Sequence, residues 1–508
     1  MVLVAEEIEL KLTASADTLA AVRAHPAVAA VQSGPMRTTQ VVSTYYDTPA
    51  RELAAAGIAL RVRRAGDRWL QTVKGNGSAA AGMHQRAEFE WPLAQPRVDA
   101  NKLADTPWRK LFAQHVRRCR PVFATDVERS AQPLTFADGT QATLCLDVGK
   151  IRAGRKHVPV TEIELELSQG DPARLFELAT ALVADLPARV SVASKAQRGY
   201  ALAAQAPAEP RRARAVSLEA DVPAYRALAQ IGQECIAQIE SNAEAMLASD
   251  DPEYLHQLRV GWRRLRSLFK LASLLAPPDK IVPLEQELEW VGETLGPARD
   301  YDVFAIETLP AVAAQFRGRR EIVRLRARVA RRRRRLRDAA RQLLGTTRFQ
   351  QLLLSLGAFL LELGKSASAD GAVVLARDWV RPLLDKRNRK VHKRTRHAYR
   401  LEAPERHRAR VAAKQLRYAA EFFSPLFSGK RANEFVSALS KLQGSLGRLN
   451  DLAVAGRLLT EVVPSTTDHE LAHAIGIVRG WLAASVAPEL KRLREARRRF
   501  AECVPFWD

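Results

Sequence analysis

Cysteine is scarce in this chain of 508 residues, and the spacing of the few that occur argues against two kinds of stabilised domain. The four cysteines form no CxxC pair, which disfavours both a disulfide framework and a zinc ribbon; they are Cys119, Cys145, Cys235 and Cys503. The first residues show no basic stretch followed by an apolar core, so no secretory leader is visible. The most apolar stretch, LLLSLGAFLLELG from Leu352, is too short and too interrupted to span a bilayer. We therefore expect a cytoplasmic protein without a membrane partner.

Acidic residues are also in short supply, with 56 Asp and Glu against 79 Lys and Arg and a net charge of +23. The excess is uneven: residues 1–203 hold 26 basic and 21 acidic side chains, whereas residues 204–508 hold 53 and 35. The second half should therefore have an anionic partner. Charge alone leaves nucleic acid, an anionic membrane surface and polyphosphate open.

The pattern of the chain changes once, at a stretch rich in Pro, Ala and Arg, and this predicts two domains. Residues 1–203 read as strands with a few helices, residues 204–216 as a linker, and residues 217–508 as long helices. Eight strands are expected, near residues 5–12, 40–47, 57–64, 68–74, 84–92, 121–131, 141–149 and 157–168. We expect an α+β domain in which eight antiparallel strands close a barrel, followed by an all-α domain.

The helical half contains an internal repeat. HQLRVGWRRLR from His256 returns as HRARVAAKQLR from His407, and LGPARD from Leu295 returns as LGRLND from Leu446. Both pairs are offset by 151 residues, which predicts a duplicated helical bundle with pseudo-twofold symmetry.

Charged residues alternate with apolar ones in the predicted strands. In EEIELKL, Glu7, Glu9 and Lys11 share one face, and TEIELELS repeats the pattern with three glutamates from Glu162. The same alternation places these further charges on strand faces or beside them: Arg61, Arg63, Lys74, Arg86, Glu88, Arg129, Asp147 and Lys195. Any one such strand is ordinary as a solvated face. If all of them point inward, the barrel interior is a charged tunnel, and buried charges need a partner or a ligand.

A tunnel of this kind suits a polyphosphate with a divalent cation. Arg and Lys clamp phosphate oxygens, and carboxylates hold Mg²⁺ or Mn²⁺ against them. A bound cation lowers the pKa of a water for attack, and positive charge stabilises the leaving phosphate.

Together EIELK, YYDTP at Tyr45, the Arg61/Arg63 pair, LDVG at Asp147, EIELEL and SKAQRGY resemble the CYTH superfamily of triphosphate tunnel metalloenzymes, and most closely its bacterial inorganic triphosphatases. The resemblance implies an eight-stranded tunnel that hydrolyses tripolyphosphate with Mg²⁺ or Mn²⁺. It implies metal ligands at Glu7, Glu9, Glu162 and Glu164, and catalytic roles for Glu7, Glu9 and Lys11. Phosphate-binding residues would be Lys11, Arg61, Arg63, Lys74, Arg86, Arg129 and Lys195, with Glu88, Asp147 and Glu166 as a supporting acidic set. Tyr45 and Asp47 are left outside the site as packing and turn residues.

Each repeated helix carries a basic stripe. At about 100° per residue, the two stripes each fall within an arc of roughly 80°, and they consist of His256, Arg259, Arg263 and Arg266, and of His407, Arg410, Lys414 and Arg417. Stacked like charges repel, so an anion or acidic side chains should face them. With LGPARD and LGRLND, the pattern resembles the CHAD domain, which implies two four-helix bundles around a basic surface that binds polyphosphate.

The sequence thus predicts a metal-dependent inorganic triphosphatase whose helical half binds polyphosphate and can associate with polyphosphate granules. A polyphosphate-binding protein without catalysis, and a triphosphatase for thiamine triphosphate or nucleotides, stay open as alternatives. Binding of nucleic acid through the arginine-rich helices is a less favoured third hypothesis. The arginine block from Arg324 to Arg337 has no assigned role, and oligomeric state is undetermined.

Overall fold

The computed structural model describes residues 3–205, 209–366, 373–400, 402–427, 429–463 and 468–507. It divides into two compact units, each of which is treated by itself. Unit 1 consists of residues 1–211 with 236–245 and 345–362, and unit 2 consists of residues 212–235, 246–344 and 363–508. Part of the predicted linker, residues 206–208, lies outside the described residues.

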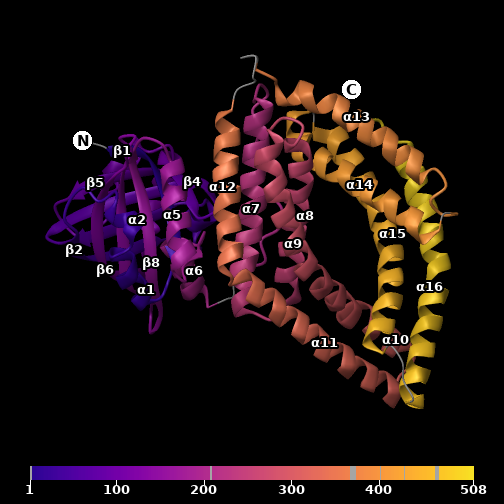
Figure 1. The fold of residues 1–508 in the computed structure, drawn as a ribbon. Coiled ribbons are helices and arrows are strands. Elements are labelled where there is room, and N and C mark those ends of the chain that lie inside the picture. The colour runs from indigo at the N-terminus through magenta and orange to yellow at the C-terminus, as the bar shows by residue number, and fades with distance from the viewer. Residues whose placement is uncertain are drawn as a thin grey trace. The chain divides into compact units, whose positions relative to one another are not determined.

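Unit 1 is built on a closed antiparallel barrel (Figure 1). Its eight long strands match the eight predicted ones; they are β1 (Leu3–Thr13), β2 (Arg37–Asp47), β3 (Ala59–Ala65), β4 (Arg68–Ala80), β5 (Met83–Leu93), β6 (Arg120–Thr135), β7 (Gln141–Ala153) and β8 (Lys156–Gln169). The order β5-β4-β3-β2-β6-β7-β8-β1 closes because β1 also pairs with β5. A ninth strand of two residues, β9 (Arg189–Val190), pairs with β1 and was not predicted.

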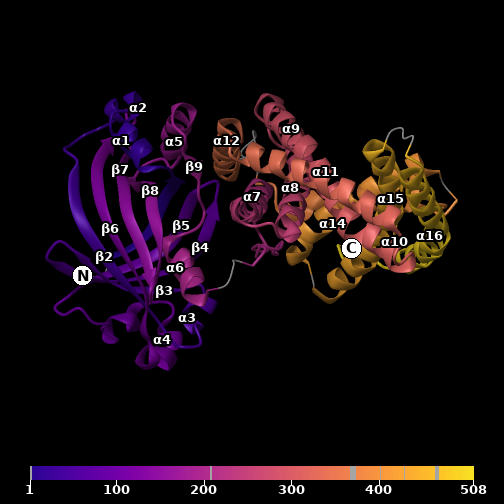
Figure 2. The ribbon, with the colours of Figure 1, turned by 90° about the horizontal axis from the view of Figure 1, so that it is seen from below.

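Short helices cover the ends of the barrel. In Figure 2, α1, α2 and α5 lie at one end of the strands and α3 and α4 at the other. Their bounds are α1 (Ala16–Arg23), α2 (Pro26–Ala29), α3 (Glu52–Ala55), η1 (Asn101–Asp105), α4 (Arg109–His115), η2 (Val116–Arg118), α5 (Ala173–Asp185) and α6 (Lys195–Ala204). Apolar residues on the outer faces of the strands pack beneath α4 around Phe89 and Phe112. A second cluster around Phe123 lies on the inner faces of the strands, since it includes Tyr45, and packs against α6. The barrel interior is therefore divided between the apolar cluster against α6 and a polar part lined by charged side chains.

Unit 1 also includes two helical segments from far along the sequence, 236–245 and 345–362. The backbone N–H of Ala81 donates to the Glu240 carboxylate at 2.9 Å, and that of Val190 donates to Gln350 Oε1 at 2.9 Å. A Cβ added at Gly357 would lie 2.3 Å from the Cβ of Ala81, so glycine is required for this close approach.

Unit 2 is helical, and its helix bounds repeat with the offset found in the sequence. α8 (Pro252–Ala272) and α14 (Ala403–Phe423) are offset by 151 residues at both ends, and α9 (Pro278–Val303) and α15 (Gly429–Val462) at their starts. The other elements are η3 (Phe304–Thr308, π-helical), α10 (Leu309–Gln315), α11 (Arg320–Leu344), α13 (Ala376–Thr395), η4 (Ser424–Leu426) and α16 (His469–Ala501). Helices α7 (Ala224–Ala248) and α12 (Thr347–Lys365) each have residues in both units. Helices α7, α8, α9 and α11 thus correspond to α13, α14, α15 and α16, and the predicted duplication is present.

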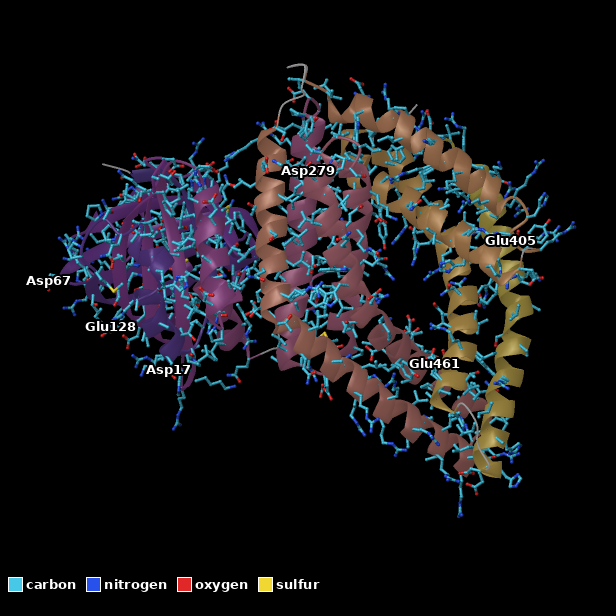
Figure 3. All side chains as sticks on the ribbon, viewed as in Figure 1. Asp17, Asp67, Glu128, Asp279, Glu405 and Glu461 are labelled. Atoms are coloured by element: carbon cyan, nitrogen blue, oxygen red, sulfur yellow. The ribbon has the colours of Figure 1, made fainter. Side chains whose placement is uncertain are left out.

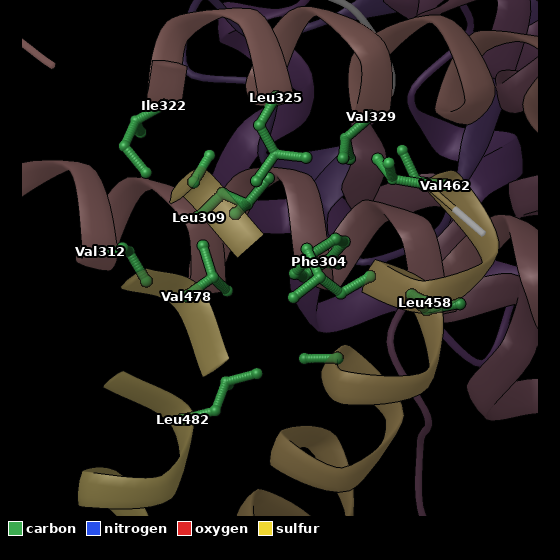
Figure 4. Close-up of a cluster of buried hydrophobic side chains, with 14 of the residues drawn as sticks. Phe304, Leu309, Val312, Ile322, Leu325, Val329, Leu458, Val462, Val478 and Leu482 are labelled. Carbon is green, nitrogen blue, oxygen red and sulfur yellow. The ribbon is translucent and has the colours of Figure 1, made fainter. Parts of the chain in front are cut away.

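One apolar cluster joins the two copies where α11 meets α15 and α16. Figure 4 shows Ile322, Leu325 and Val329 of α11 beside side chains from η3, α10, α15 and α16. By length and composition α16 is the one described helix that could cross a membrane, and 22% of its apolar window is buried.

Candidate active site in the barrel

The barrel turns its charged side chains inward. On β1, Glu9 is 2% exposed, whereas its neighbour Glu6 is exposed and accepts from Gln85 at 2.7 Å. On β6, Glu128 is exposed and lies at the outer edge of the barrel in Figure 3. Arg129, the next residue, lines the internal cavity instead. The alternation predicted from the sequence therefore places the charges in one shared interior.

The interior cavity has a volume of 330 Å³. Six carboxylates line it, those of Glu7, Glu9, Glu88, Glu90, Glu164 and Glu166. Seven cations face them, those of Lys11, Arg61, Arg63, Lys74, Arg86, Arg129 and Lys195. The wall is thus almost balanced in charge, so a polyanion that enters alone would leave the interior strongly negative. A polyanion together with cations would restore the balance.

Lys11 lies in the middle of the acidic wall. Its ammonium is 2.9 Å from Glu164, 3.6 Å from Glu9 and 3.9 Å from Glu162. Burial alone would lower the pKa of Lys11, but these carboxylates raise it above the usual value. Burial opposes ionisation of Glu9 and Glu164 as well, yet Lys11 is the largest of the charges that hold the pKa of each carboxyl below its usual value. Lys11, Glu9 and Glu164 are therefore charged at neutral pH.

Helix α6 contributes a second cation to this wall. The capping box of Ser194 and Gln197 fixes the start of the helix, so that the next residue, Lys195, faces the strands. The Lys195 ammonium is 2.6 Å from Glu162, 2.7 Å from Asp147 and 2.9 Å from Glu164.

Arg129 of β6 connects the acidic groups of two other strands, β7 and β8. It forms ion pairs with Asp147, Glu166 and Glu164, the first two at 2.8 Å. Although burial opposes its charge, Asp147 and the two glutamates raise the pKa of Arg129 well above its usual value. Asp147 is completely buried and does not line the cavity, so its role is to orient Arg129 and Lys195.

The opposite wall is mainly basic. Lys74 pairs with Glu7 and with Glu88 at 3.3 Å; Arg86 pairs with Glu9 and with Glu7 at 3.0 Å. Arg61 reaches Glu88 at 3.3 Å.

Arg63 differs from the other cations of the cavity, because it has no ion pair within the described residues. Its Nε donates to Ser43 Oγ at 3.3 Å. Burial, Arg61 and Arg129 together lower its pKa from the usual value. This guanidinium is therefore the cation most in need of an anionic ligand.

Two groups of carboxylates are close enough to share a cation. Glu9, Glu164 and Glu166 form one group and Asp147, Glu162 and Glu164 the other, with one oxygen of each member within 4.8 Å of the rest. All-oxygen donor sets of this kind suit Mg²⁺ or Mn²⁺. The first group fits better, because its members line the cavity, whereas Asp147 and Glu162 do not. Of the predicted metal ligands, Glu7 lies apart from both groups, with Lys74 and Arg86.

Several residues of the site lie outside the predicted set. Arg198 pairs with Glu162 at 2.6 Å, and Glu90 lines the cavity and accepts from Thr72 at 3.1 Å. Tyr45 lines the cavity and its hydroxyl accepts from Arg61 at 3.4 Å. The YYDTP motif was a signal for Tyr45, but the alternation of charges says nothing of an uncharged residue. Asp47 is a capping residue, as weighed from the sequence, because it accepts from the N–H groups of Leu53 and Ala54.

The basic stripes of unit 2 face each other. Arg263 and Arg259 of α8 lower the pKa of Lys414 on α14. For Asp300 on α9, Arg410 of α14 lowers the pKa and Asp451 of α15 raises it. All eight stripe residues except His407 are half-buried. Arg266 reaches Glu289 at 3.5 Å and Arg417 reaches Glu421 at 3.2 Å. We call these eight residues the duplicated basic surface.

Four cations in the middle of the duplicated basic surface form no ion pair with a carboxylate in the described parts of the chain: Arg259, Arg263, Arg410 and Lys414. Burial lowers the pKa of each of Arg259, Arg410 and Lys414, and neighbouring guanidinium groups add to the effect. Such a cluster is unfavourable unless an anion lies against it.

The arginine block of α11 has a mixed role. Arg333 and Arg337 form ion pairs with the buried Asp302 at 2.6 and 2.9 Å, and Arg324 reaches Asp468 at 2.7 Å. Arg328, Arg331 and other members are exposed. At least part of the block therefore stabilises the helical packing.

The fold and the charges define a two-part class of protein: a closed antiparallel barrel with an ionic interior, joined to a duplicated helical domain with a basic surface. A model of the CYTH domain matches residues 5–200, and a model of the CHAD domain matches residues 230–460. The chain belongs to both families, with the CYTH domain first.

Two relatives illustrate this assignment. The chain is 33% identical over 162 residues to the inorganic triphosphatase of Haemophilus influenzae, a match that covers 32% of this chain and 45% of that protein. The chain therefore spans less than half of that relative. The CHAD domain of the plant Ricinus communis is 35% identical with a TM-score of 0.51, and the match covers 57% of this chain and 96% of that one.

Proposed function

We propose that unit 1 is a metal-dependent inorganic triphosphatase that hydrolyses tripolyphosphate to diphosphate and phosphate. One observation carries the proposal: a single cavity of 330 Å³ holds both a carboxylate group fit for a divalent cation and a cation, Arg63, that has no carboxylate partner among the described residues. The similarity to the Haemophilus influenzae inorganic triphosphatase supports this choice of substrate.

The charge balance of the cavity explains why substrate and metal would bind together. Tripolyphosphate carries about four negative charges near neutral pH, since terminal phosphates have a second pKa near 6. The nearly balanced wall cannot neutralise this charge alone. Divalent cations held by Glu9, Glu164 and Glu166 would supply the missing positive charge.

The residues of the cavity then have separate tasks. Arg61, Arg63, Lys74 and Arg86 would hold the phosphate oxygens by charge-assisted hydrogen bonds. Lys11 stays protonated because its neighbours raise its pKa, so it can stabilise negative charge on the leaving oxygen. Burial raises the pKa of Glu166, and a cation bound by the carboxylate group would hold this carboxylate in its ionised form. A bound Mg²⁺ or Mn²⁺ would neutralise phosphate charge and make the water more acidic.

Phosphate release from tripolyphosphate with Mg²⁺ or Mn²⁺ tests the proposal. We expect turnover by the wild type and a loss of at least about 100-fold in a Glu7→Ala, Glu9→Ala double variant. Glu6→Ala is the matched control, because Glu6 is on the same strand but exposed, and it should retain turnover. Absence of metal-dependent turnover in the wild type would contradict the proposal. Parallel assays with thiamine triphosphate and ATP decide the substrate.

We propose that the duplicated basic surface of unit 2 binds polyphosphate. The four central cations without carboxylate partners support this, because a chain of phosphates supplies closely spaced negative charge to both stripes. A polyphosphate-binding protein without catalysis is the second candidate, and binding without hydrolysis would favour it. The protein would then work in the cytoplasm at polyphosphate granules, a location that imaging of the tagged chain can test.

A further inference from the structure

The first copy of the duplicated basic surface places its guanidinium groups against the backbone of a neighbouring helix. A Cβ added at Gly296 of α9 would lie 3.1 Å from Nη1 of Arg259, and one added at Gly292 would lie 3.3 Å from Nη1 of Arg266. Arg259 Nη1 also donates to the carbonyl of Gly292 at 3.4 Å. The two glycines thus provide the space in which these arginines are held, and holding them in advance lowers the entropy cost of binding an anion.

The second copy lacks this arrangement at the equivalent positions. Gln443 occupies the position of Gly292, and a Cβ added at Gly447, the equivalent of Gly296, meets nothing within 4 Å. Arg417, the equivalent of Arg266, pairs with Glu421 on its own helix and lies over the ring of Tyr418. Equal spacing in the sequence therefore gives two stripes that differ in how their cations are held.

The two copies also differ in their central cation, which is Arg263 in the first and Lys414 in the second. Burial, Arg263, Arg410 and Arg259 lower the pKa of Lys414 to about 6, against the opposing effect of Asp451. The charged groups that face it are thus three arginines on α8 and α14 and one aspartate on α15, with Asp300 of α9 close to Arg410. Lys414 is half-buried and forms no ion pair with a carboxylate of the described residues, so no anionic side chain holds its charge, whereas arginine keeps its charge in such surroundings.

We propose that the two copies bind polyphosphate unequally: Arg259 and Arg266 of the first copy anchor the anion on Gly296 and Gly292, and Lys414 of the second copy takes up a proton when the anion binds. This inference depends on the proposed binding of polyphosphate by unit 2. Phosphate oxygens beside the amine favour the ammonium form, so a neutral amine becomes an ammonium by taking one proton from solution. Polyphosphate affinity should then weaken as the pH rises above about 6.

Paired substitutions at the two equivalent glycines test the anchoring. Leucine favours helix more than glycine does, so neither Gly296→Leu nor Gly447→Leu should weaken its helix. We expect Gly296→Leu to weaken the binding of long-chain polyphosphate to the full chain at least about fivefold, since it displaces Arg259. Gly447→Leu should change the affinity less than about twofold. Equal effects of the two variants would overturn the inequality of the copies.

Calorimetry of the full chain with long-chain polyphosphate at pH 7.5 tests the proton uptake. Titrations in two buffers with different heats of ionisation give the number of protons taken up, and Lys414→Arg is the reference because its charge is permanent. We expect wild type to take up clearly more protons than Lys414→Arg, which also subtracts proton exchange by polyphosphate itself. Equal uptake by the two proteins would overturn this part of the proposal. A complete lack of binding by both would contradict the proposed function of unit 2 instead.

Discussion

Arg129 and Asp147 form a two-point ion pair on adjacent strands, with Nε 2.8 Å from Oδ1 and Nη2 2.8 Å from Oδ2. Asp147 is completely buried, so its charge depends on Arg129 and on Lys195, which lies 2.7 Å away. Burial opposes ionisation of Asp147, but Lys195 and Arg129 together hold its pKa below the usual value. The pair thus fixes the acidic wall on which the proposed site depends.

Replacing Arg129 by alanine should destabilise unit 1 by about 3–5 kcal/mol, because the buried Asp147 loses a partner. Urea unfolding compares the variant with wild type. Arg152→Ala is the control. Arg152 of β7 pairs with Asp126 of β6 and so links the same two strands, but its side chain is 51% exposed. The control should cost less than about 1 kcal/mol. A similar loss in both variants would show that the burial of Asp147 is not the cause.

Replacing Arg63, unlike replacing Arg129, should not destabilise unit 1. Arg63 has no carboxylate partner within the described residues, and its pKa is lowered by burial, Arg61 and Arg129, so its charge opposes folding. Arg63→Gln should leave the free energy of unfolding unchanged or slightly increased. The KM for tripolyphosphate should rise at least about tenfold, because one charged phosphate contact is lost. Steady-state kinetics and urea unfolding of the same preparation decide this prediction; a large loss of stability would contradict it.

The alternation of charges was enough to predict which strand residues share the interior, because successive side chains of a strand point to opposite faces. It placed Glu9 on the charged face shared with Lys11, and the structure has both side chains inside. Alternation does not identify strand neighbours, so the closure of β1 on β5 came from the family resemblance. The assignment of Glu7, rather than Glu166, to the metal came from the same source and stays a prediction.

Other features depend on contacts that no local pattern encodes. Arg198 reaches Glu162 from helix α6, 36 residues later in the chain. The residues 236–245 and 345–362 join unit 1 although the change of pattern at residue 204 places them with the helices. Arg259 lies close to the backbone of Gly296, but no side chain of the described residues lies close to the equivalent Gly447. The repeat at one fixed offset does not reveal this difference.

The two copies of unit 2 differ in polar packing at Asp302. Its carboxylate is completely buried and pairs with Arg333 at 2.6 Å and with Arg337 at 2.9 Å, whereas the equivalent residue is Ala453. Asp302→Asn should destabilise the contact of α9 with α11 by about 3–5 kcal/mol, since Arg337 is 3% exposed and would keep an unpaired charge.

Hydrogen exchange of the α9 and α11 amides measures this local effect. Arg331→Ala is the control, because Arg331 is on α11 like Arg337 but is exposed. The exchange rates of this variant should be close to those of wild type. Unchanged protection of α11 in Asp302→Asn would mean that the arginine block does not depend on this carboxylate.

Glu240 gives unit 1 a stability that depends on pH. Burial raises the pKa of this carboxyl to about 8, although the hydrogen bond from the Ala81 N–H lowers it. The folded state therefore binds the proton more tightly than the unfolded state, whose carboxyl has a pKa near 4.5. The stabilising contribution is complete below about pH 4.5 and is lost as the pH rises towards 8.

Glu240→Gln keeps an acceptor for the Ala81 N–H and removes the ionisation. The variant should match wild type at pH 4.5 and exceed its stability by a few kcal/mol at pH 8.5, since each unit of pKa shift corresponds to about 1.4 kcal/mol. Urea unfolding at the two pH values measures this difference in the free energy of unfolding. Other carboxylate pairs weaken at low pH in both proteins, so their effect cancels when the variant is compared with wild type. Glu177→Gln, at an exposed carboxylate paired with Arg174, should show no such change between the two pH values. A pH-independent difference between Glu240→Gln and wild type would show that Glu240 is ionised in the folded protein throughout this range.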